Sequence, residues 1–554
     1  MSTKEYRTPL EMFYKWEKEK AESPLFKWPQ DGSWHELTWK QAGDQIRRVA
    51  KALKDLDLPA GSHIGILSKN CPYWIMTDIA IWMAGHVSVP LYPNLTAETV
   101  NTILTHSGTK VLFVGKLDGW EAMKPGIPSD VKCFSYPYGN KGYEDWTDLC
   151  AKNEPIKENI QREYEDVATI IYTSGTTGVP KGVIHNFLSF SCAGENGAKL
   201  AQLSPNDRFF SYLPLSHVAE RLLVETCGLY CGGLIYFAES LDTFVDNLKT
   251  ARPTVFLSVP RLWTKFQMGI LGKLPQKKLN TLLKIPFISG LIKKKVLKGL
   301  GLDQARIAAT GAAPISLTLL EWWKSLGLTI LEGYGMTENF AYSHLNLPNE
   351  EKFGFVGQAM PGVDVRLSDE GEIQIKNECL MNGYYKEPVL TEEVFADGYL
   401  RTGDQGAIDQ NGYLKITGRV KDLFKTGKGK YVVPSPIELK ISKSSLIEQV
   451  CVAGNGLPQP IALINLSEDG KSRSKEEVTK ELQGLMSEIN PTIDHHERPE
   501  KFIIVRDDWS VENNVLTPTM KIKRNVVEKT YQESFEGWYD TSSKVIWSDQ
   551  PFLQ

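Results

Sequence analysis

The chain has 554 residues, of which 42% are hydrophobic and 23% are charged, and its formal net charge is −4. This length exceeds what one hydrophobic core supports, so we expect at least two domains. The charge balance gives no sign of nucleic-acid binding, and no run of about 18 apolar residues predicts a membrane-spanning helix. The first residues lack the apolar segment of a secretory signal, so we expect none.

Strands and helices are expected to alternate in the first part of the chain. We predict a helix ending at Leu53, a strand at 63–67, a helix at 72–83, a strand at 87–91, a helix at 96–106 and a strand at 110–114. Such alternation predicts a doubly wound α/β sheet. None of these elements carries an obvious catalytic group, and we expect their apolar side chains to form core.

A segment rich in glycine and threonine, 173–182, follows an apolar strand expected at 167–171. Glycines let a backbone approach a ligand closely, and hydroxyls, N–H groups and a lysine can bind a polyphosphate. No Gly-Lys-Ser/Thr ends the segment, so it is not the Walker pattern. A flexible surface loop is the alternative interpretation. The candidate phosphate ligands are Thr173, Ser174, Gly175, Thr176, Thr177, Gly178 and Lys181.

Further candidates stand where predicted strands end. His217 closes a Leu-Pro-Leu-Ser-His segment at the start of a helix, although a lone histidine is more often structural. The small residues Gly311, Ala312 and Ala313 follow a strand and would let a flat ring approach the backbone. The segment Glu332-Gly333-Tyr334-Gly335-Met336-Thr337-Glu338 comes next.

Residues of the 332–338 segment have side chains suited to a nucleotide. Tyr334 offers an aromatic face, and Thr337 offers a hydroxyl to a phosphate. Glu338 offers the hard oxygen that Mg²⁺ prefers. An ordinary strand and turn, with threonine and glutamate in capping positions, is the alternative.

The last third of the chain carries further candidate site residues, which are far apart in sequence. A β-rich segment is expected at 351–385, and a small α/β domain is expected from residue 422 onward. The candidates are Asp404, Arg419, Lys421, the glycines Gly427 and Gly429 of a Lys/Gly-rich run, and Lys521 in a Lys-Ile-x-Arg element.

Taken together, these segments resemble the motifs of the acyl-adenylate-forming superfamily of acyl-CoA synthetases, luciferases and peptide-synthetase adenylation domains. The Leu-Pro-Leu-Ser-His segment, followed by Glu220 and Arg221, is similar to the long-chain fatty acyl-CoA synthetase branch. Thr-Met before Lys521 is similar to that branch as well. The resemblance implies a large N-terminal domain, 1–420, of doubly wound sheets with a β-rich subdomain. It also implies a small, mobile C-terminal α/β domain at 421–554.

The resemblance also implies residue roles and the cofactors ATP, Mg²⁺ and CoA. Lys521, Thr337, Glu338 and His217 would be catalytic, with His217 lining the acyl pocket and Glu338 binding the metal. The 311–313 turn and the 332–335 segment, with Tyr334, would hold adenine, and Asp404 and Arg419 would contact the ribose. Lys421 would be the hinge between the domains, and the loop with Gly427 and Gly429 would cover the CoA tunnel.

The implied reaction is ATP-dependent conversion of a long-chain fatty acid to an acyl-adenylate and pyrophosphate, followed by thioester formation with CoA. Three alternatives stay open: an acyl-AMP ligase that supplies a carrier protein, a medium-chain or aryl-CoA ligase, and a scaffold without activity. Some long-chain members carry a tryptophan gate where this chain has Arg221, so the chain departs from that pattern here. Acyl chain length and oligomeric state do not follow from the sequence.

Residues 247–302 contain ten lysines and two arginines but no aspartate or glutamate. Within them, the segment 282–298 mixes apolar and basic residues. Such a segment can lie on an anionic membrane surface, which would place the protein peripherally at the inner face of a membrane. A solvated basic loop that reaches the phosphates of CoA is the equal alternative.

The eight cysteines are scattered, and none forms a Cys-x-x-Cys pair. Cys227 and Cys231 have no histidine nearby at metal-binding spacing. Free thiols of this kind are typical of a reducing compartment, so we expect a cytoplasmic protein.

Overall fold

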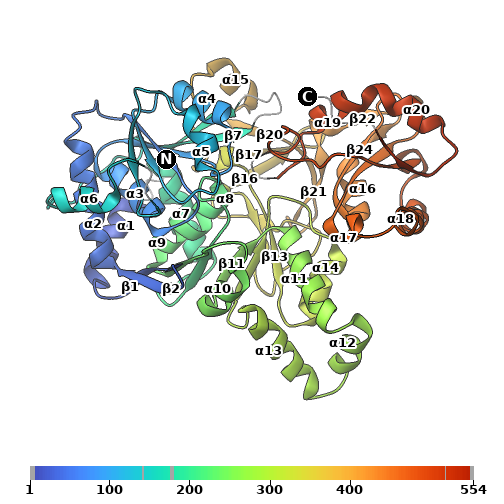
Figure 1. Cartoon of the computed structure of the whole chain (residues 1–554), viewed down its shortest axis with the longest axis horizontal. Coiled ribbons are helices and arrows are strands. Elements are labelled where there is room, and N and C mark those ends of the chain that lie inside the picture. Colours follow the sequence, from blue (N-terminus) through green and yellow to red (C-terminus); the bar gives the residue numbers. More distant parts are fainter. Residues whose placement is uncertain (1–5, 140–141, 175–179, 518–519, 550–554) are drawn as a thin grey trace. The chain divides into compact units, whose positions relative to one another are not determined.

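The computed structural model describes residues 6–139, 142–174, 180–517 and 520–549 (Figure 1). The chain forms two compact units. Unit 1 comprises Met1–Ala313, Leu317–Val365 and Ile375–Leu400, and unit 2 comprises Pro314–Ser316, Arg366–Gln374 and Arg401–Gln554. The expected division at 420/421 stays a prediction. Among the described helices, none has both the length and the hydropathy needed to cross a bilayer.

A seven-stranded sheet in unit 1 carries the N-terminal alternation predicted from the sequence. Its order is β18 (Gly383–Tyr384), β8 (Pro180–Asn186), β7 (Val167–Ser174), β4 (Val87–Leu91), β3 (His63–Leu67), β5 (Val111–Val114) and β6 (Lys132–Ser135). The strands from β7 to β6 are parallel, whereas β8 and β18 are antiparallel to their neighbours. Every residue of β4 and β5 is buried, as expected for parallel strands covered on both faces.

A second sheet of unit 1 has nine strands and a parallel centre. Its order is β15 (Gln358–Ala359), β14 (His344–Leu345), β13 (Ile330–Tyr334), β12 (Ile307–Thr310), β11 (Val255–Ser258), β9 (Arg208–Ser211), β10 (Leu234–Phe237), β1 (Pro24–Gln30) and β2 (Ser33–Thr38). The strands from β13 to β1 are parallel.

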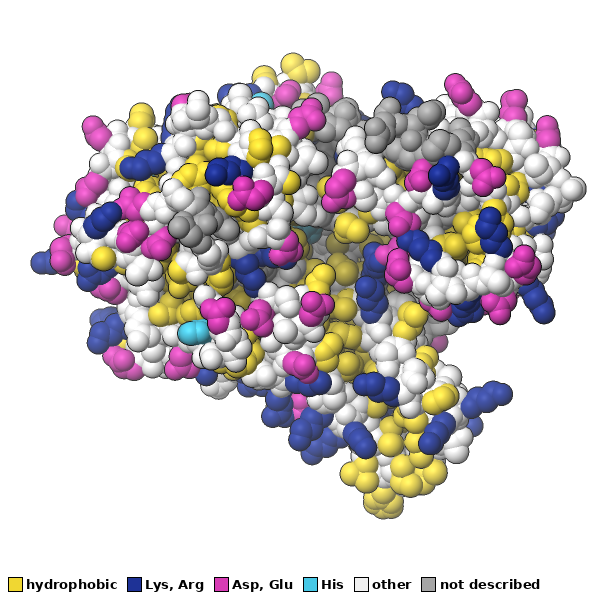
Figure 2. Space-filling model, in the orientation of Figure 1, with side chains coloured by type: hydrophobic (Ala, Val, Ile, Leu, Met, Phe, Trp, Pro, Cys, Tyr) yellow, Lys and Arg dark blue, Asp and Glu magenta, His cyan; other side chains and the backbone are white. Residues whose placement is uncertain are grey.

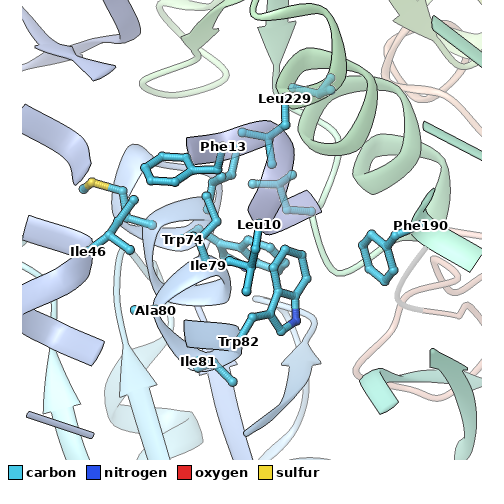
Figure 3. Close-up of a cluster of buried hydrophobic side chains, with 14 of the residues drawn as sticks. Leu10, Phe13, Ile46, Trp74, Ile79, Ala80, Ile81, Trp82, Phe190 and Leu229 are labelled. Atoms are coloured by element: carbon cyan, nitrogen blue, oxygen red, sulfur yellow. The ribbon is translucent and has the colours of Figure 1, made fainter. Parts of the chain in front are cut away.

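Helices of unit 1 supply much of its core. Figure 3 shows Phe13 of α1, Trp74 and Trp82 of α3, and Phe190 of α7 within one apolar cluster, in which all four are at most 1% exposed. The longer helices are α1 (Pro9–Glu19), α2 (Trp39–Lys54), α3 (Pro72–Met83), α4 (Ala97–Ser107), α7 (Phe187–Leu200), α10 (Phe244–Ala251), α11 (Pro260–Lys273), α12 (Gln276–Leu283), α13 (Ile288–Leu300) and α14 (Leu317–Ser325). The short ones are α5 (Trp120–Met123), α6 (Trp146–Lys152), α8 (Val218–Glu220), α9 (Cys227–Cys231) and α15 (Pro388–Val394), with a π-helix at Arg221–Thr226.

The core of unit 2 is a four-stranded sheet. Its order is β24 (Ile447–Ala453), β25 (Ile461–Leu466), β26 (Lys501–Ile504) and β27 (Val545–Trp547). The remaining helices are α16 (Pro434–Ile441), α17 (Glu468–Lys471), α18 (Lys475–Ile489), α19 (Arg524–Tyr531) and α20 (Phe535–Asp540). Strand β27 comes from the C-terminal tail and pairs in parallel with β26, so the tail completes this sheet. No pattern in the tail predicts that role.

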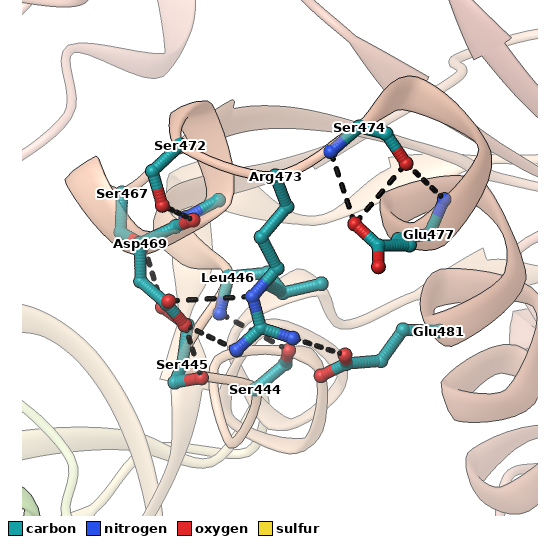
Figure 4. Close-up of polar contacts among 11 residues, drawn as sticks. Ser444, Ser445, Leu446, Ser467, Asp469, Ser472, Arg473, Ser474, Glu477 and Glu481 are labelled. Carbon is teal, nitrogen blue, oxygen red and sulfur yellow. Dashed lines mark hydrogen bonds and ion pairs between the residues drawn. The ribbon is translucent and has the colours of Figure 1, made fainter.

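The charged helix α18 starts with a polar network. Ser474 caps the helix by accepting a hydrogen bond from the amide of Glu477 at 3.2 Å, and the Glu477 carboxylate accepts one from the amide of Ser474 (Figure 4). Arg473 joins Asp469 and Glu481 beside this cap. The opposite face of the helix buries Val478, Leu482 and Met486 against the sheet.

Three strands continue from one unit into the other: β16 (Asp364–Leu367), β17 (Glu372–Lys376) and β20 (Tyr399–Ile408). Three more short strands, β19 (Phe395–Ala396), β22 (Phe424–Lys425) and β23 (Tyr431–Val432), accompany β21 (Leu414–Arg419).

Candidate active site

The antiparallel pair β7 and β8 flanks the predicted phosphate loop. Thr173 stands opposite Lys181, and Ser174 stands opposite Pro180, at the ends of the two strands. The predicted ligands Gly175, Thr176, Thr177 and Gly178 lie outside the described residues. The strand pair therefore fixes where the loop leaves and re-enters the sheet.

Glu338 lies in a short 3₁₀ turn, η3 (Thr337–Asn339), and is held from the neighbouring strand β18. The Tyr384 hydroxyl donates to Oε1 of Glu338 at 2.8 Å, and the amide of Met381 donates to the Glu338 carbonyl at 2.8 Å. Burial, followed by the charge of Glu338, raises the pKa of Tyr384, so its hydroxyl stays a donor at neutral pH.

Lys181 belongs to the same cluster. Its Nζ lies 5.6 Å from the centre of the Tyr384 ring, within cation–π range. Tyr384 reaches this place because β18 pairs with β8, where Tyr384 stands opposite Val183. One tyrosine thus connects a lysine beside the phosphate loop with the predicted metal ligand.

Thr337 is held by a buried histidine. The carbonyl of Thr337 lies 2.7 Å from Nε2 of His185, and since a carbonyl only accepts, the ring donates there. Nδ1 of His185 then accepts a hydrogen bond from the Ser189 hydroxyl at 3.2 Å. Burial lowers the pKa of His185 to about 4, so the ring is neutral at pH 7. Asn339 Oδ1 closes the other side of the turn by accepting from the Met336 amide.

The small-residue turn predicted to face adenine follows β12. Ala312 has a φ of 66°, in the left-handed region, and both Ala312 and Ala313 are exposed. A Cβ on Gly311 would lie 3.3 Å from the carbonyl oxygen of Gly333 on the neighbouring strand. The turn thus leaves a piece of exposed backbone beside the end of β13.

The end of β13 is shaped by the second glycine of the segment and by two polar side chains. A Cβ on Gly335 would come within 2.6 Å of the Ala341 backbone, which leaves no room for a side chain. Tyr334 is half-buried, with its ring 6.3 Å from that of His344. Burial raises the pKa of Glu332 to about 7, while its Oε2 accepts from the Gly354 amide at 2.9 Å.

His217 caps the short helix α8. Its Nδ1 accepts a hydrogen bond from the Ala219 amide at 3.2 Å, and its carbonyl accepts from the Arg221 amide at 3.1 Å. The capping hydrogen bond therefore gives Nδ1 of His217 a structural role. The predicted role of His217 in an acyl pocket stays a prediction.

Arg221, at the position where some long-chain synthetases carry a tryptophan, is fully buried in a polar network. It forms ion pairs with Asp78 and Glu225, and it donates to Thr169 Oγ1 at 2.6 Å and to Ser88 Oγ at 3.0 Å. Burial is the main cause that raises the pKa of Glu225 well above its usual range. The network ties α3 to the π-helix, so this arginine has a structural role at that place.

In unit 2, the predicted ribose ligands contact each other. Asp404 of β20 and Arg419 of β21 are register partners, and Oδ1 of Asp404 lies 2.9 Å from Nε of Arg419. The Arg419 side chain is 51% exposed and the Asp404 side chain is 15% exposed. The pairing explains how two residues 15 positions apart in sequence reach one place.

The predicted hinge and CoA loop follow β21. Lys421 is exposed in a 3₁₀ turn, η4 (Val420–Asp422). Gly427 and Gly429 lie in the turn between β22 and β23. A Cβ on Gly427 would come 2.6 Å from the carbonyl oxygen of Gly456, and Gly429 has a φ of 74°. Gly427 therefore leaves no room for a side chain, and Gly429 has a backbone conformation that favours glycine.

Lys521 is exposed at the base of a loop in unit 2. Its amide donates to the Thr517 hydroxyl at 3.0 Å, and its carbonyl accepts from the Thr517 amide at 2.8 Å. Arg524, at the end of the same element, is largely buried, with 15% of its side chain exposed, and donates to Glu438 at 2.6 Å. Arg524 thus anchors the element that presents Lys521.

The chain belongs to the AMP-binding enzyme family, a family of adenylate-forming ligases. The family description "AMP-binding enzyme" matches residues 13–385, and "AMP-binding enzyme C-terminal domain" matches residues 421–543. These matches include the turn with Thr337 and Glu338 as well as the loop with Lys521. The resemblance expected from the motifs is confirmed.

Among curated proteins, the chain is similar to long-chain-fatty-acid–CoA ligase FadD15 of Mycobacterium bovis, with 29% identity over 566 residues that cover 92% of this chain and 93% of the relative. It is 30% identical to long-chain-fatty-acid–CoA ligase 5 of Rattus norvegicus, over 91% of this chain and 84% of the relative.

Among solved structures, the chain is similar to the adenylation domain of a carboxylate reductase from Mycobacterium chelonae. The TM-score is 0.83 at 22% identity, with 97% of this chain and 91% of that chain covered. An anthranilate CoA ligase in complex with anthranoyl-AMP gives a TM-score of 0.78 at 21% identity, covering 96% and 98%. These likenesses confirm the predicted fold class, a large N-terminal α/β domain with a smaller C-terminal one.

Sequence reasoning missed Tyr384 and His185, which hold Glu338 and Thr337. Tyr384 stands next to a second tyrosine in the predicted β-rich segment, and nothing local distinguishes the two. His185 sits in an apolar strand just after the phosphate loop. A histidine so close to the predicted phosphate loop could have been named as a candidate from the sequence. Its partner, the Thr337 carbonyl, can be identified only from the structure.

Proposed function

We propose that this protein uses ATP to convert a long-chain fatty acid to an acyl-adenylate and pyrophosphate, and then transfers the acyl group to CoA. The observation that carries the proposal is the cluster of Lys181, Tyr384, Thr337 and Glu338 beside the strands that bound the phosphate loop. The long-chain names of relatives that match more than nine-tenths of the chain support the choice of acid.

The chemistry of adenylation calls for such a cluster. A carboxylate is a poor electrophile, and its attack on the α-phosphorus of ATP places developing charge on phosphate oxygens. Lys181 would stabilise the terminal phosphates, and the Thr337 hydroxyl would donate to the α-phosphate. Thr173 and the glycine- and threonine-rich loop would supply further donors.

Glu338 fits Mg²⁺ as a single carboxylate ligand. Within the described residues, no group of three or more His, Cys, Asp or Glu side chains is placed to hold a metal. Mg²⁺ binds through one or two carboxylates together with phosphate oxygens and water, so it does not need such a group. When bound, it would neutralise phosphate charge, and Tyr384 would fix the carboxylate that receives it.

Unit 2 would supply the remaining groups. Asp404 would accept hydrogen bonds from the ribose hydroxyls, with Arg419 beside it. Lys521 would bridge the attacking carboxylate and the α-phosphate. In the second half-reaction, a turn at Lys421 would replace Lys521 with the loop of Gly427 and Gly429, over which CoA enters.

Two other outcomes of the same adenylation chemistry define the test: transfer to a carrier protein, and activation of medium-chain or aryl acids. Purified protein is assayed for acid-dependent ATP–pyrophosphate exchange and for CoA thioester, using acids from octanoate to icosanoate and benzoate. We expect both activities, with the highest kcat/KM for long-chain acids. Exchange without thioester would favour a carrier protein, and no exchange with any acid would refute the proposal.

All eight cysteines are described, and none forms a disulfide. This supports a cytoplasmic location, which we retain as part of the proposal.

A further inference from the structure

Helices α12 and α13 form a hairpin whose tip is apolar and exposed. Phe287 is 93% exposed and Leu291 is 69% exposed, and Ile285 and Ile288 are more than a third exposed. In the space-filling view the end of the hairpin is apolar, with basic side chains beside it (Figure 2). Four large apolar side chains within seven residues form a patch, which isolated surface residues do not.

The backbone at the tip holds Phe287 outward. Phe287 has a φ of 64° and a ψ of −44°, and the Ile288 amide donates to the Pro286 carbonyl at 2.8 Å. This is a γ-turn with a phenylalanine at its centre, a rare and strained conformation for a bulky residue. The strain of this turn is not offset by burial of the Phe287 ring within the chain. We therefore expect the apolar surface of the ring to contact an external partner.

The base of the hairpin is fixed to unit 1 while the tip is not. Leu279 of α12 is fully buried, and Gln276 accepts a hydrogen bond from the Trp322 indole at 2.9 Å. In α13, all of which is described, none of the residues is buried. The hairpin is therefore a helical projection with an apolar end, and its lysines lie mostly on helices and not in a loop. The alternative, that these lysines reach the phosphates of CoA, stays a prediction.

The charge around the tip selects the partner. Seven lysines lie on the two helices and in the turn that joins them, and residues 247–302 contain no acidic side chain. An apolar tip within a basic collar complements a bilayer with anionic headgroups, in which the ring enters the acyl boundary and the ammonium groups stay at the phosphates. The lysines of this collar are Lys277, Lys278, Lys284, Lys293, Lys294, Lys295 and Lys298.

We propose that the α12–α13 tip, residues 284–298, is a docking site for an anionic lipid surface. The proposal does not depend on the proposed catalytic function, because binding to vesicles is measured without substrates.

The test is flotation of the full chain with vesicles of phosphatidylcholine, or with vesicles in which about a third of the lipid is phosphatidylglycerol. We expect binding to the anionic vesicles only, weakened by added salt. Replacing Phe287 and Leu291 by serine should lower the partition coefficient at least about tenfold. Equal binding of wild type to both vesicle types, or no binding to either, would overturn the proposal.

The charge contribution is tested with two quadruple lysine-to-glutamate variants that change the net charge equally. The collar variant, with substitutions at 293, 294, 295 and 298, should bind at least about tenfold more weakly. The control, at exposed lysines outside 247–302, should stay within about twofold of wild type. Equal loss in both variants would show a general charge effect and refute a docking site. The control positions are Lys54, Lys124, Lys132 and Lys157.

A second copy of the chain is the competing occupant. If wild type is an oligomer by light scattering and the Phe287→Ser/Leu291→Ser variant is a monomer, the tip is a protein interface and the lipid proposal is wrong. A monomeric wild type that floats with anionic vesicles supports it. Thermal unfolding of each variant should match wild type, because none of the substituted side chains is buried.

Discussion

Replacing Tyr384 by phenylalanine removes one hydroxyl and leaves the ring that packs beside Lys181. The hydroxyl donates to Oε1 of Glu338 at 2.8 Å, and this carboxylate is half-exposed. A hydrogen bond to a charged group contributes about 1.5–3 kcal/mol. Since water can replace part of it here, we take the lower end, about 1.5 kcal/mol, which corresponds to roughly a tenfold effect on rate or affinity.

The Mg²⁺ dependence of ATP–pyrophosphate exchange measures this effect. With Tyr384→Phe, we expect the Mg²⁺ concentration for half-maximal exchange to rise about tenfold, because the carboxylate loses the donor that orients it. Thermal unfolding should shift little. A merely structural tyrosine would lower stability without changing the Mg²⁺ dependence.

The neighbouring tyrosine provides a matched control. Tyr385 packs its ring against those of His63 and His106, away from Glu338. Tyr385→Phe removes the same hydroxyl and should leave the Mg²⁺ dependence unchanged. If Tyr384→Phe matches wild type, or if both variants shift equally, the assignment of Tyr384 as the residue that positions Glu338 is refuted.

Three further predictions address other parts of the chain. Lys521→Ala should abolish acyl-adenylate formation but retain thioester formation from supplied acyl-adenylate, as measured by the two half-reactions separately; equal loss of both would contradict it. Arg221→Met should lower the free energy of unfolding by about 3–5 kcal/mol, because Asp78 and Glu225 stay buried without their cation. Since burial raises the pKa of Glu225, this loss should be larger at alkaline than at acidic pH in urea titrations, and a pH-independent loss would contradict it. The folded pKa of Glu332, about 7, lies above its unfolded value, so its contribution to stability should be complete at low pH and should be lost as the pH rises toward 7. In Glu332→Gln, the free energy of unfolding should therefore fall by about 3 kcal/mol less over this pH range than in wild type. An unchanged pH profile would refute this.

Several strands of unit 1 could be predicted because their apolar patterns are local in the sequence, whereas their order in the sheets was not predicted. The strands His63–Leu67 and Val87–Leu91 are short apolar runs between turns, and the structure has them with those bounds. The C-terminal strand Val545–Trp547 could not be predicted in the same way. It is three residues long, and its stability comes from pairing with β26, a contact that no local pattern encodes.

In the candidate site too, the residues of a local motif could be predicted and their distant partners could not. Thr337 and Glu338 could be named because they stand together in one motif. Their supports come from far away: Tyr384 is 46 residues from Glu338, and His185 is 152 residues from Thr337. Hydrogen bonds of this kind depend on strand pairing, so they become visible only once β18 and β8 lie side by side.

Two ion pairs in the chain show how burial decides what an arginine can do. Arg221 and its carboxylates are 0% exposed, so separating them would leave charges without water, at a cost of several kcal/mol. Arg419 is 51% exposed, and an exposed pair of this kind contributes only about 0–1 kcal/mol. Breaking the Arg419–Asp404 ion pair so that Asp404 can bind another group therefore costs little free energy. If Asp404 binds ribose as proposed, the exposed pair can hold its carboxylate in place until the ribose hydroxyls compete for it, a role that the buried arginine, fixed by its own network, cannot take.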